Sequence, residues 1–262
     1  MWHETVGTII TNEQLTAEDY LMELHCKDIA TNAKPGQFVN VACTSGLDPL
    51  LRRPISIHQV DKVKGTISLL FKAVGKGTKL LTAKANEQAV KLTGPLGKGF
   101  HIPSGEKTLV VGGGMGVAPL YFLINQLCDA GNDVTVVLGV KDGTWQPICN
   151  LFENRNCSLY FASEDGSIGQ KGLVTDVVKE IIEKESITHL YTCGPEPMMK
   201  NVVLLAEGKN IKTQVSMERT MACGVGACLG CTCEKKAGDQ VVFKRVCTDG
   251  PVFSGDEVIW NG

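Results

Sequence analysis

Short runs of alternating apolar and polar residues dominate the N-terminal part of the chain. They occupy residues 5–10, 19–26, 38–43, 55–60, 66–74 and 89–94. A period of two residues is typical of strands that bury one face, and the turn residues between the runs favour antiparallel neighbours. The pattern therefore predicts a small antiparallel β-barrel within residues 1–101.

From residue 108 onward, continuous apolar runs alternate with amphipathic stretches. The runs predict buried parallel strands at 108–112, 134–140, 158–163, 189–193 and 212–216. Helices are expected around 119–128, 173–184 and 197–207. Such alternation predicts a doubly wound α/β domain over residues 102–216, so the fold class is a multidomain α+β protein.

Composition and charge narrow the possible functions. With 262 residues, 43% of them apolar, the chain is long enough for two domains and a small appendage. A net charge of -2 gives no electrostatic case for nucleic acid. The uncharged stretch 109–128 has about a membrane-spanning length, but its central glycines and proline indicate a strand, a turn and a helix. We therefore expect no membrane segment.

The cysteine count bears on the compartment. The chain has eleven cysteines, an odd number spread over its whole length, and no signal peptide is recognised. A secreted disulfide framework usually has an even number in a small domain. The cytoplasm is therefore the expected location.

A glycine-rich turn follows the first predicted parallel strand. It comprises Gly112, Gly113, Gly114, Met115 and Gly116. Nucleotides bind at the carboxyl ends of strands in such sheets, where glycines let the backbone approach a pyrophosphate. An ordinary strand-to-helix turn is the alternative interpretation of this motif.

A second loop of this kind follows a later strand and also opens a predicted helix. It comprises Cys193, Gly194, Pro195 and Glu196. Because the carboxyl ends of parallel strands meet at one edge of the sheet, the two loops are expected to form one nucleotide site.

Two patterns in the predicted barrel carry candidate chemistry. The first, Arg53, Pro54, Ile55 and Ser56, places an arginine and a serine on an apolar strand, which suits a phosphate and a flavin edge. A surface arginine pair beside a core strand is the alternative. The second pattern is a strand end followed by a glycine turn at a helix start, where free N–H groups can receive a pyrophosphate. Its residues are Leu70, Phe71, Lys72, Gly77 and Thr78.

Cysteines are concentrated near the C-terminal end. Cys223, Cys228 and Cys231 form a C-x4-C-x2-C pattern, and Cys247 follows. This is the plant-type spacing that holds a [2Fe–2S] cluster by four thiolates. A four-cysteine zinc site is the alternative, although such a site usually has two C-x2-C pairs.

The residues between these cysteines fit a loop around a cluster. Gly224, Gly226 and Gly230 are expected to take positive φ, so that N–H groups turn toward the sulfurs. Cys233 lies only two residues after Cys231 and is expected to pack rather than to act as a fifth ligand.

In this order, the motifs resemble the electron-transfer subunits of class 1B dihydroorotate dehydrogenase, within the ferredoxin–NADP reductase superfamily. The likeness spans the chain through RRPIS, GGGMGVAPL, CGPEPMM, SMERTMACGVGACLGC and VCTDGPVF. It implies a FAD-binding barrel at 1–101, an NAD-binding domain at 102–216 and a [2Fe–2S] domain at 217–262. The last piece is too short for a complete ferredoxin domain, so metal ligation and docking are expected to hold it.

The resemblance also implies roles for individual residues. The barrel motifs bind FAD, the four cysteines ligate the cluster, and Cys193 has a positional role beside the nicotinamide. Glu218 lies near flavin and nicotinamide by the same likeness, with a solvated surface glutamate as the alternative. Ile55 replaces a family tyrosine, so another group must cover the flavin face.

Cofactor choice follows from the residues after a predicted strand. Family members that use NADP commonly carry an arginine after the serine that corresponds to Ser163. Here Glu164 and Asp165 stand in its place and would repel a 2′-phosphate. NAD is therefore favoured.

Electron counting sets the order of the cofactors. NAD accepts a two-electron hydride, a [2Fe–2S] cluster passes single electrons, and a flavin does both, so FAD stands between them. The family implies an FMN-containing catalytic subunit that oxidises dihydroorotate to orotate, in a heterotetramer with two copies of each chain. In this chain we expect neither a dihydroorotate site nor a catalytic side chain, and the cluster is expected at the interface with the partner.

Three other functions remain open from the residues. The first is a related electron-transfer subunit, of a sulfhydrogenase or of an NADH-dependent ferredoxin:NADP oxidoreductase. The second is a free-standing NADH reductase that feeds a soluble acceptor. The third is a zinc-bearing regulator without enzymatic activity.

Overall fold

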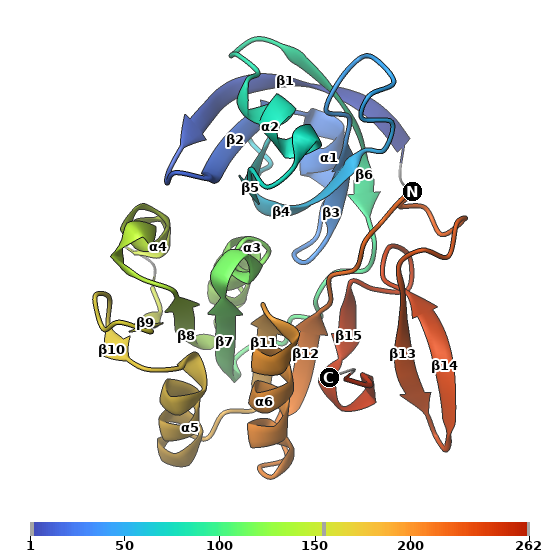
Figure 1. Cartoon of the computed structure of the whole chain (residues 1–262). Coiled ribbons are helices and arrows are strands. Elements are labelled where there is room, and N and C mark those ends of the chain that lie inside the picture. Colours follow the sequence, from blue (N-terminus) through green and yellow to red (C-terminus); the bar gives the residue numbers. More distant parts are fainter. Residues whose placement is uncertain (1–2, 154–155, 261–262) are drawn as a thin grey trace.

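Six antiparallel strands close the N-terminal barrel in the order β1-β2-β5-β4-β3-β6 (Figure 1). The computed structural model describes residues 3–153 and 156–260. The strands are β1 His3–Gln14, β2 Asp19–His25, β3 Phe38–Val41, β4 Arg53–Asp61, β5 Thr66–Lys72 and β6 Ala89–Leu96. Two short helices, α1 (Lys27–Asn32) and α2 (Lys76–Thr82), lie between β2 and β3 and between β5 and β6. The predicted barrel is confirmed.

A second sheet has the strand order β10-β9-β8-β7-β11-β12-β15. Its strands are β7 Lys107–Gly113, β8 Asp133–Val140, β9 Ser158–Ser163, β10 Gln170–Lys171, β11 His189–Cys193, β12 Lys212–Ser216 and β15 Val252–Ser254. The helices are α3 Leu120–Asp129, α4 Gln146–Phe152, α5 Val174–Lys184 and α6 Glu196–Glu207, with 3-10 turns η1 Gly114–Val117, η2 Gly143–Trp145 and η3 Gly255–Glu257. All pairs are parallel except β12 with β15.

Both faces of this sheet are buried, which explains its continuous apolar runs. On β7, Val110 packs with α3 and α4, whereas Leu109 and Val111 pack with α5 and α6 on the opposite face. Successive strand residues point to opposite faces of the sheet. Because helices cover both faces, apolar residues can occupy every position of such a strand. The predicted doubly wound domain is confirmed.

Some short elements are not evident from the sequence pattern. Helix α4 has seven residues and β15 has three. Such lengths are too short for a helical or strand period to stand out. They form because Phe152 of α4 and Phe253 of β15 are buried against the larger elements.

The C-terminal part, called the cap here, comprises the hairpin of β13 (Thr232–Ala237) and β14 (Gln240–Arg245) with its flanking loops. The cap shares its core with the rest of the molecule. One buried cluster joins barrel, sheet and cap: Phe38, Leu96, Met199, Val203, Val215, Met217, Cys231, Cys233, Val246, Cys247, Phe253 and Val258. Strand β15 adds antiparallel pairing to β12. The cap is therefore docked by packing and by backbone hydrogen bonds together.

The stretch 109–128, with its membrane-like composition, divides as predicted. It contains most of β7, the turn η1 and most of α3. Within the ranges that the structure describes, no helix is both long and apolar enough to span a bilayer.

Removal of the Phe253 ring tests the shared core. Phe253→Ala should lower the free energy of unfolding by about 3–5 kcal/mol, because the lost ring leaves a cavity between sheet and cap. Urea unfolding of the holoprotein, followed by circular dichroism, measures this. Phe243→Ala is the matched control, since that ring is 68% exposed, and it should change stability by no more than about 0.5 kcal/mol. Equal losses in the two variants would contradict the shared core.

Candidate functional site

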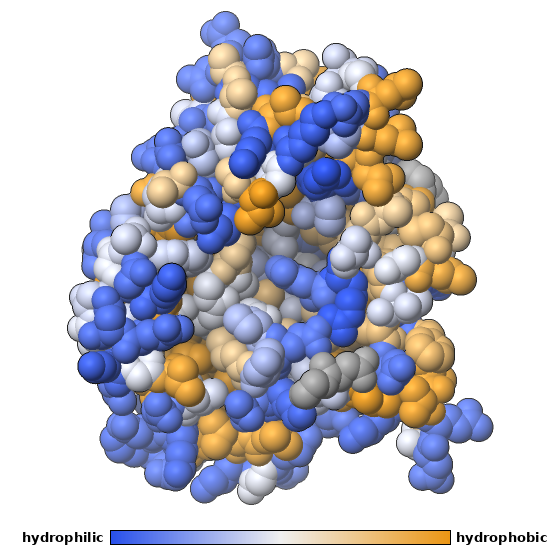
Figure 2. Space-filling model, viewed as in Figure 1, coloured by the Kyte–Doolittle hydropathy of each residue, from blue (hydrophilic) through white to orange (hydrophobic). Residues whose placement is uncertain are grey.

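A cavity of about 340 Å³ opens between the barrel, the turn after β7 and the segment that leads into the cap. Figure 2 shows this face of the molecule hollowed between the barrel and the α/β part. All residues predicted to bind FAD line the cavity except Gly77: Arg53, Pro54, Ile55, Ser56, Leu70, Phe71, Lys72 and Thr78. Met115 and Glu218, predicted to lie near the nicotinamide side, line the same cavity.

The two adjacent arginines of β4 have different surroundings. Arg53 lines the cavity, and its Nη1 donates to Leu51 O at 2.7 Å. A Cβ on Gly77 would lie only 2.7 Å from Arg53 Nε, so a glycine is needed for the guanidinium to occupy this place. Arg52 instead donates to Glu4 and Thr93 on the barrel wall. Of the two arginines, only Arg53 therefore lines the cavity.

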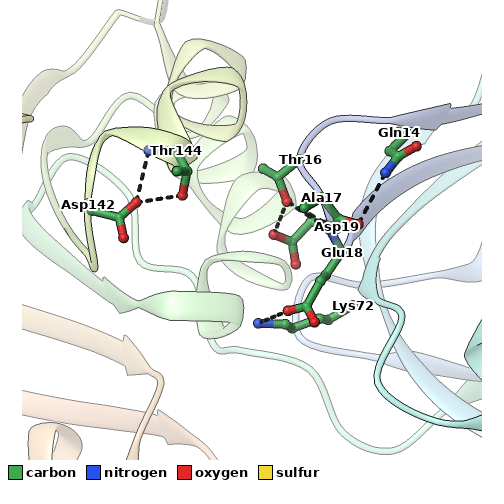
Figure 3. A network of polar contacts seen from close by, with 8 residues as sticks. All are labelled: Gln14, Thr16, Ala17, Glu18, Asp19, Lys72, Asp142 and Thr144. Carbon is green, nitrogen blue, oxygen red and sulfur yellow. Dashed lines mark hydrogen bonds and ion pairs between the residues drawn. The ribbon is translucent and has the colours of Figure 1, made fainter.

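Lys72 lies at the rim of the cavity in an ion pair. Its Nζ is 2.9 Å from the Glu18 carboxylate, which raises the pKa of Lys72 and lowers that of Glu18. Figure 3 shows this pair beside the β1–β2 turn, with Asp142 and Thr144 of the loop after β8 on the facing side. The Lys72 ammonium is thus held at the rim as one half of an ion pair that carries no net charge.

The two predicted nucleotide loops interlock. A Cβ on Gly116 would lie 2.4 Å from Cys193 O, and one on Gly113 would lie 2.4 Å from Met198 Sδ. Gly114 differs, since its φ is +52° and the space around its Cβ position is open. These contacts hold the backbone close to the carboxyl ends of β7 and β11, where the order of the strands reverses. Such a reversal is the usual ligand crevice of an open α/β sheet.

Cys193 is the last residue of β11, and Glu218 lies two residues after the end of β12. Cys193 is buried, and burial, followed by the nearby Glu218 charge, raises the pKa of its thiol far above the ordinary value. The thiol is therefore neutral, as a positional role requires. The Glu218 side chain is exposed at the rim, yet enough protein surrounds its carboxyl for desolvation to raise its pKa.

Arg219 links the cavity to the second nucleotide loop. It lines the cavity, its Nη1 is paired with Glu196, and the same nitrogen donates to Glu218 O at 2.9 Å. Glu196 therefore holds the segment that leads into the cap.

The ends of β8 and β9 carry a row of negative charge. Asp142 accepts from Thr144 N at 2.9 Å, and Asp165 accepts from Ser167 Oγ at 2.6 Å and Ser167 N at 3.0 Å. The pKa of each aspartate is lowered, mainly by the hydroxyl that it accepts from. Glu164 is exposed beside them. This edge suits neutral ribose hydroxyls better than a phosphate.

The four predicted cluster cysteines lie in two pairs. Cys228 N donates to Cys223 Sγ at 3.4 Å, and Cys247 N donates to Cys231 Sγ at 3.5 Å. Across the described ranges 3–153 and 156–260, no three His, Cys, Asp or Glu side chains converge on one ion. A [2Fe–2S] core has two irons, each of which takes two protein ligands. Two pairs therefore fit such a core.

Backbone donors set the charge state of these thiols. Val225 N and Cys228 N donate to Cys223 Sγ at 3.5 and 3.4 Å. Burial acts to raise the pKa of Cys223, but these donors lower it to about 6. Burial and the neighbouring Cys231 raise the pKa of Cys247 to about 11. This inner thiol needs the positive charge of a metal to ionise at neutral pH.

The glycine prediction for this loop is partly wrong. Gly224 and Gly226 are left-handed, with φ of 70° and 83°. Gly230 is not, and the preceding Leu229 has a φ of 58° instead. The chain reverses one residue earlier than expected, which lets Gly230 N donate to Cys228 Sγ at 3.5 Å.

The barrel contacts the cysteine loop through Asn40. Asn40 of β3 donates from Nδ2 to Cys223 O at 3.4 Å, and a Cβ on Gly224 would lie 2.4 Å from the same nitrogen. Cys233 is buried in the cluster shared by barrel, sheet and cap, in keeping with the expected packing role.

Several residues of the cavity were not expected from the sequence. They are Phe38, Val74, Ala118, Ser216, Met217, Arg219, Met221 and Pro251. Ser216 ends a predicted parallel strand, and the carboxyl ends of such strands are a general signal for ligand contact. Phe38 and Pro251 come from other parts of the fold and carry no local signal.

Comparisons with known proteins agree with this geometry. A family described as the iron-sulfur cluster binding domain of dihydroorotate dehydrogenase B matches residues 218–259, and the oxidoreductase NAD-binding domain matches residues 110–203. Among solved structures, that of an NADH-dependent reduced ferredoxin-NADP oxidoreductase has a TM-score of 0.86 at 29% identity, covering 98% of this chain and 90% of that chain. A ferredoxin NADP+ reductase from Neisseria gonorrhoeae shares the fold, with a TM-score of 0.65 at 14% identity over 84% of this chain and 95% of that chain.

Curated relatives cover almost the whole chain. The electron transfer subunit of dihydroorotate dehydrogenase B (NAD(+)) from Desulforamulus reducens is 42% identical over 92% of this chain and 93% of its own length. The subunit of the same name from Geobacillus thermodenitrificans is 38% identical over 96% of this chain and 97% of its own length. At this identity and coverage, the chain belongs to the family of electron transfer subunits of dihydroorotate dehydrogenase B.

Proposed function

We propose that this chain carries electrons from a catalytic partner subunit to NAD, by way of a [2Fe–2S] cluster in the cap and FAD in the cavity. One observation carries the proposal: a single cavity contacts the barrel, the glycine turn and the segment just before the cysteine loop. Met115 comes from the glycine turn, and Met221 lies two residues before Cys223. One bound flavin can therefore reach both the glycine turn, where the nicotinamide is proposed to bind, and the cysteine loop, where the cluster is proposed to bind.

The cavity fits a flavin dinucleotide in its donors and its apolar walls. Bound FAD supplies the exchange between two-electron and one-electron steps. The Arg53 guanidinium offers directed donors to a phosphate, and the Ser56 hydroxyl offers a donor to the ring edge. The interlocked loops at Gly116 and Cys193 orient a nicotinamide by shape, because no side chain there needs to move a proton.

The residue that replaces the family tyrosine lines the cavity but exposes little of its side chain there. Ile55 is 6% exposed and belongs to the barrel core. We propose that methionines cover the ring, because Met115, Met217 and Met221 line the cavity. Thioether sulfur packs well against aromatic edges and adapts to irregular gaps.

NAD is the proposed nucleotide. The support is the row of carboxylates at Asp142, Glu164 and Asp165, at least two of which are held ionised by local hydrogen bonds. A 2′-phosphate placed there would meet like charge.

The partner is proposed to be an FMN-containing catalytic subunit that oxidises dihydroorotate to orotate, in a heterotetramer with two copies of each chain. The family name supports the existence of a partner. We propose further that residues 1–101, 102–216 and 217–262 are the functional divisions of this chain. The cytoplasm is the proposed compartment, since no disulfide joins any of the eleven cysteines, all of which lie in the described ranges.

The face around the cysteine loop suits a large partner. Cys228 is exposed, and so are apolar side chains on two structural units. Leu47, Leu50 and Leu51 project from the loop between β3 and β4, while Leu229, Val241 and Phe243 project from the cap. In Figure 2 hydrophobic surface follows the edge that holds this loop and the cap. Exposed apolar patches of this kind mark protein interfaces.

A second candidate function has one specific observation in its favour. The NADH-dependent reduced ferredoxin-NADP oxidoreductase structure matches almost the whole fold. A subunit of that type would carry the same cofactors and differ in its partner. Identification of the partner therefore decides between the two.

Substitution of single cysteines tests the cluster ligands. Cys247→Ser should abolish the visible absorbance and the iron content of the cluster while FAD remains bound, because one iron loses a thiolate. Cys233→Ser is the matched control, a buried cysteine of the same cap that should keep full iron content. Iron and flavin analysis of the purified variants measures both. Iron loss in Cys233→Ser with retention in Cys247→Ser would contradict the ligand set.

Recovery of the partner tests the proposed complex and its docking face. Affinity purification of the tagged chain from native lysate should recover a subunit that contains FMN. Leu50→Asp and Phe243→Asp should each weaken its binding about tenfold or more, because a charge enters an apolar contact.

Val63→Asp is the control for this experiment, since Val63 is 99% exposed on the turn between β4 and β5. It should bind the partner as the wild type does. Recovery of a hydrogenase would contradict the proposed partner. Equal weakening by Val63→Asp would contradict the docking face.

A further inference from the structure

His58 contacts the α/β part from the outer surface of the barrel. On β4, Ile55 and Ile57 pack in the barrel core, and Ile55 also lines the cavity together with Ser56. His58 is the next residue on the outer side and is only 2% exposed. A histidine here is buried by the neighbouring part of the molecule rather than by its own barrel.

The surroundings of His58 are specific. Its Nδ1 lies 2.9 Å from Ala118 O. Its ring stacks on Tyr121 with centroids 4.6 Å apart and an interplanar angle of 17°, and it meets the edge of Phe152 at 6.2 Å. A carbonyl oxygen can only accept, so the proton of this bond lies on Nδ1 and His58 donates. The ring is thus held in one orientation from two directions.

The acceptor of this bond belongs to the glycine turn. Ala118 follows η1 directly, and its N–H donates to Met115 O at 3.0 Å. Ala118 and Met115 both line the cavity. His58 therefore holds the backbone of residues 115–118, which lies between the cavity and the nucleotide crevice, by a bond from the barrel.

We propose that His58 is a positioning residue that sets the glycine turn, and with it the nicotinamide, against the flavin edge. This inference rests on the proposed function. Hydride transfer moves two electrons and one proton together from NADH to the flavin, and the reacting atoms must be about 3–3.5 Å apart. The barrel carries the flavin contacts and the sheet carries the nucleotide loops, so a directed bond between them fixes that separation.

Two substitutions separate the hydrogen bond from the ring contact. His58→Phe keeps a ring on Tyr121 and removes the donor. His58→Asn keeps a donor at the place of Nδ1 and removes the ring. We expect His58→Phe to slow flavin reduction by NADH about 10- to 100-fold, and His58→Asn to stay within about 3-fold of the wild type. Flavin and iron contents should be unchanged in both variants.

Two readouts do not depend on turnover. Hydrogen–deuterium exchange of residues 113–121, measured without nucleotide, should rise in His58→Phe and not in His58→Asn. The long-wavelength charge-transfer absorbance of the flavin with bound NAD should fall in His58→Phe and not in His58→Asn. If His58→Phe does not fold, His58→Leu removes the donor without introducing a second ring.

Tyr191→Phe is the matched control. The Tyr191 hydroxyl donates to His101 O at 3.1 Å and joins the sheet to the linker after the barrel, and this bond does not involve the glycine turn. It should leave flavin reduction and exchange at 113–121 unchanged. Wild-type behaviour of His58→Phe, equal losses in His58→Phe and His58→Asn, or a similar loss in Tyr191→Phe would each overturn the inference. Failure of the wild-type chain to bind NADH or FAD would instead refute the proposed function.

Discussion

The buried cluster shared by barrel, sheet and cap is the constraint on which the rest of the structure depends. Phe38 comes from β3, Val215 from β12 and Phe253 from β15, and all three are buried in it. A segment as short as the cap cannot bury enough apolar surface on its own. Its cysteines are therefore held at a fixed place relative to the cavity by side chains that belong to the other two parts.

This docking gives the cavity its third wall. The chain runs from the end of β12 through Met217, Arg219 and Met221 along the cavity before it reaches the first cysteine. Asn40 supports that cysteine from the barrel side. The same backbone thus bounds the cavity proposed for FAD and begins the loop proposed for the cluster, which places the two proposed redox sites close together without any large motion.

Much of this architecture could be predicted from the sequence. The strand periods of both sheets, the glycine turn and the cysteine spacing are local patterns, and the elements follow them closely because both faces of the second sheet are buried. The addition of β15 to β12 could not be predicted, since it depends on contacts between distant segments. The cavity methionines and the bond of His58 to Ala118 are equally non-local. The left-handed φ predicted for Gly230 is found at Leu229 instead, and in this conformation Gly230 N donates a hydrogen bond to Cys228 Sγ.

An anaerobic titration of the purified chain with NADH tests the central claim, that the cap is held close enough to the cavity for electrons to pass between them. Electron paramagnetic resonance detects the reduced cluster, and absorbance follows the flavin. The account predicts a reduced-cluster signal in the chain that contains FAD and none in the same chain stripped of FAD. Dithionite in a parallel sample shows that the cluster can be reduced. A cluster signal with NADH in the stripped chain would contradict the account. So would a cluster that NADH leaves oxidised while the flavin is fully reduced.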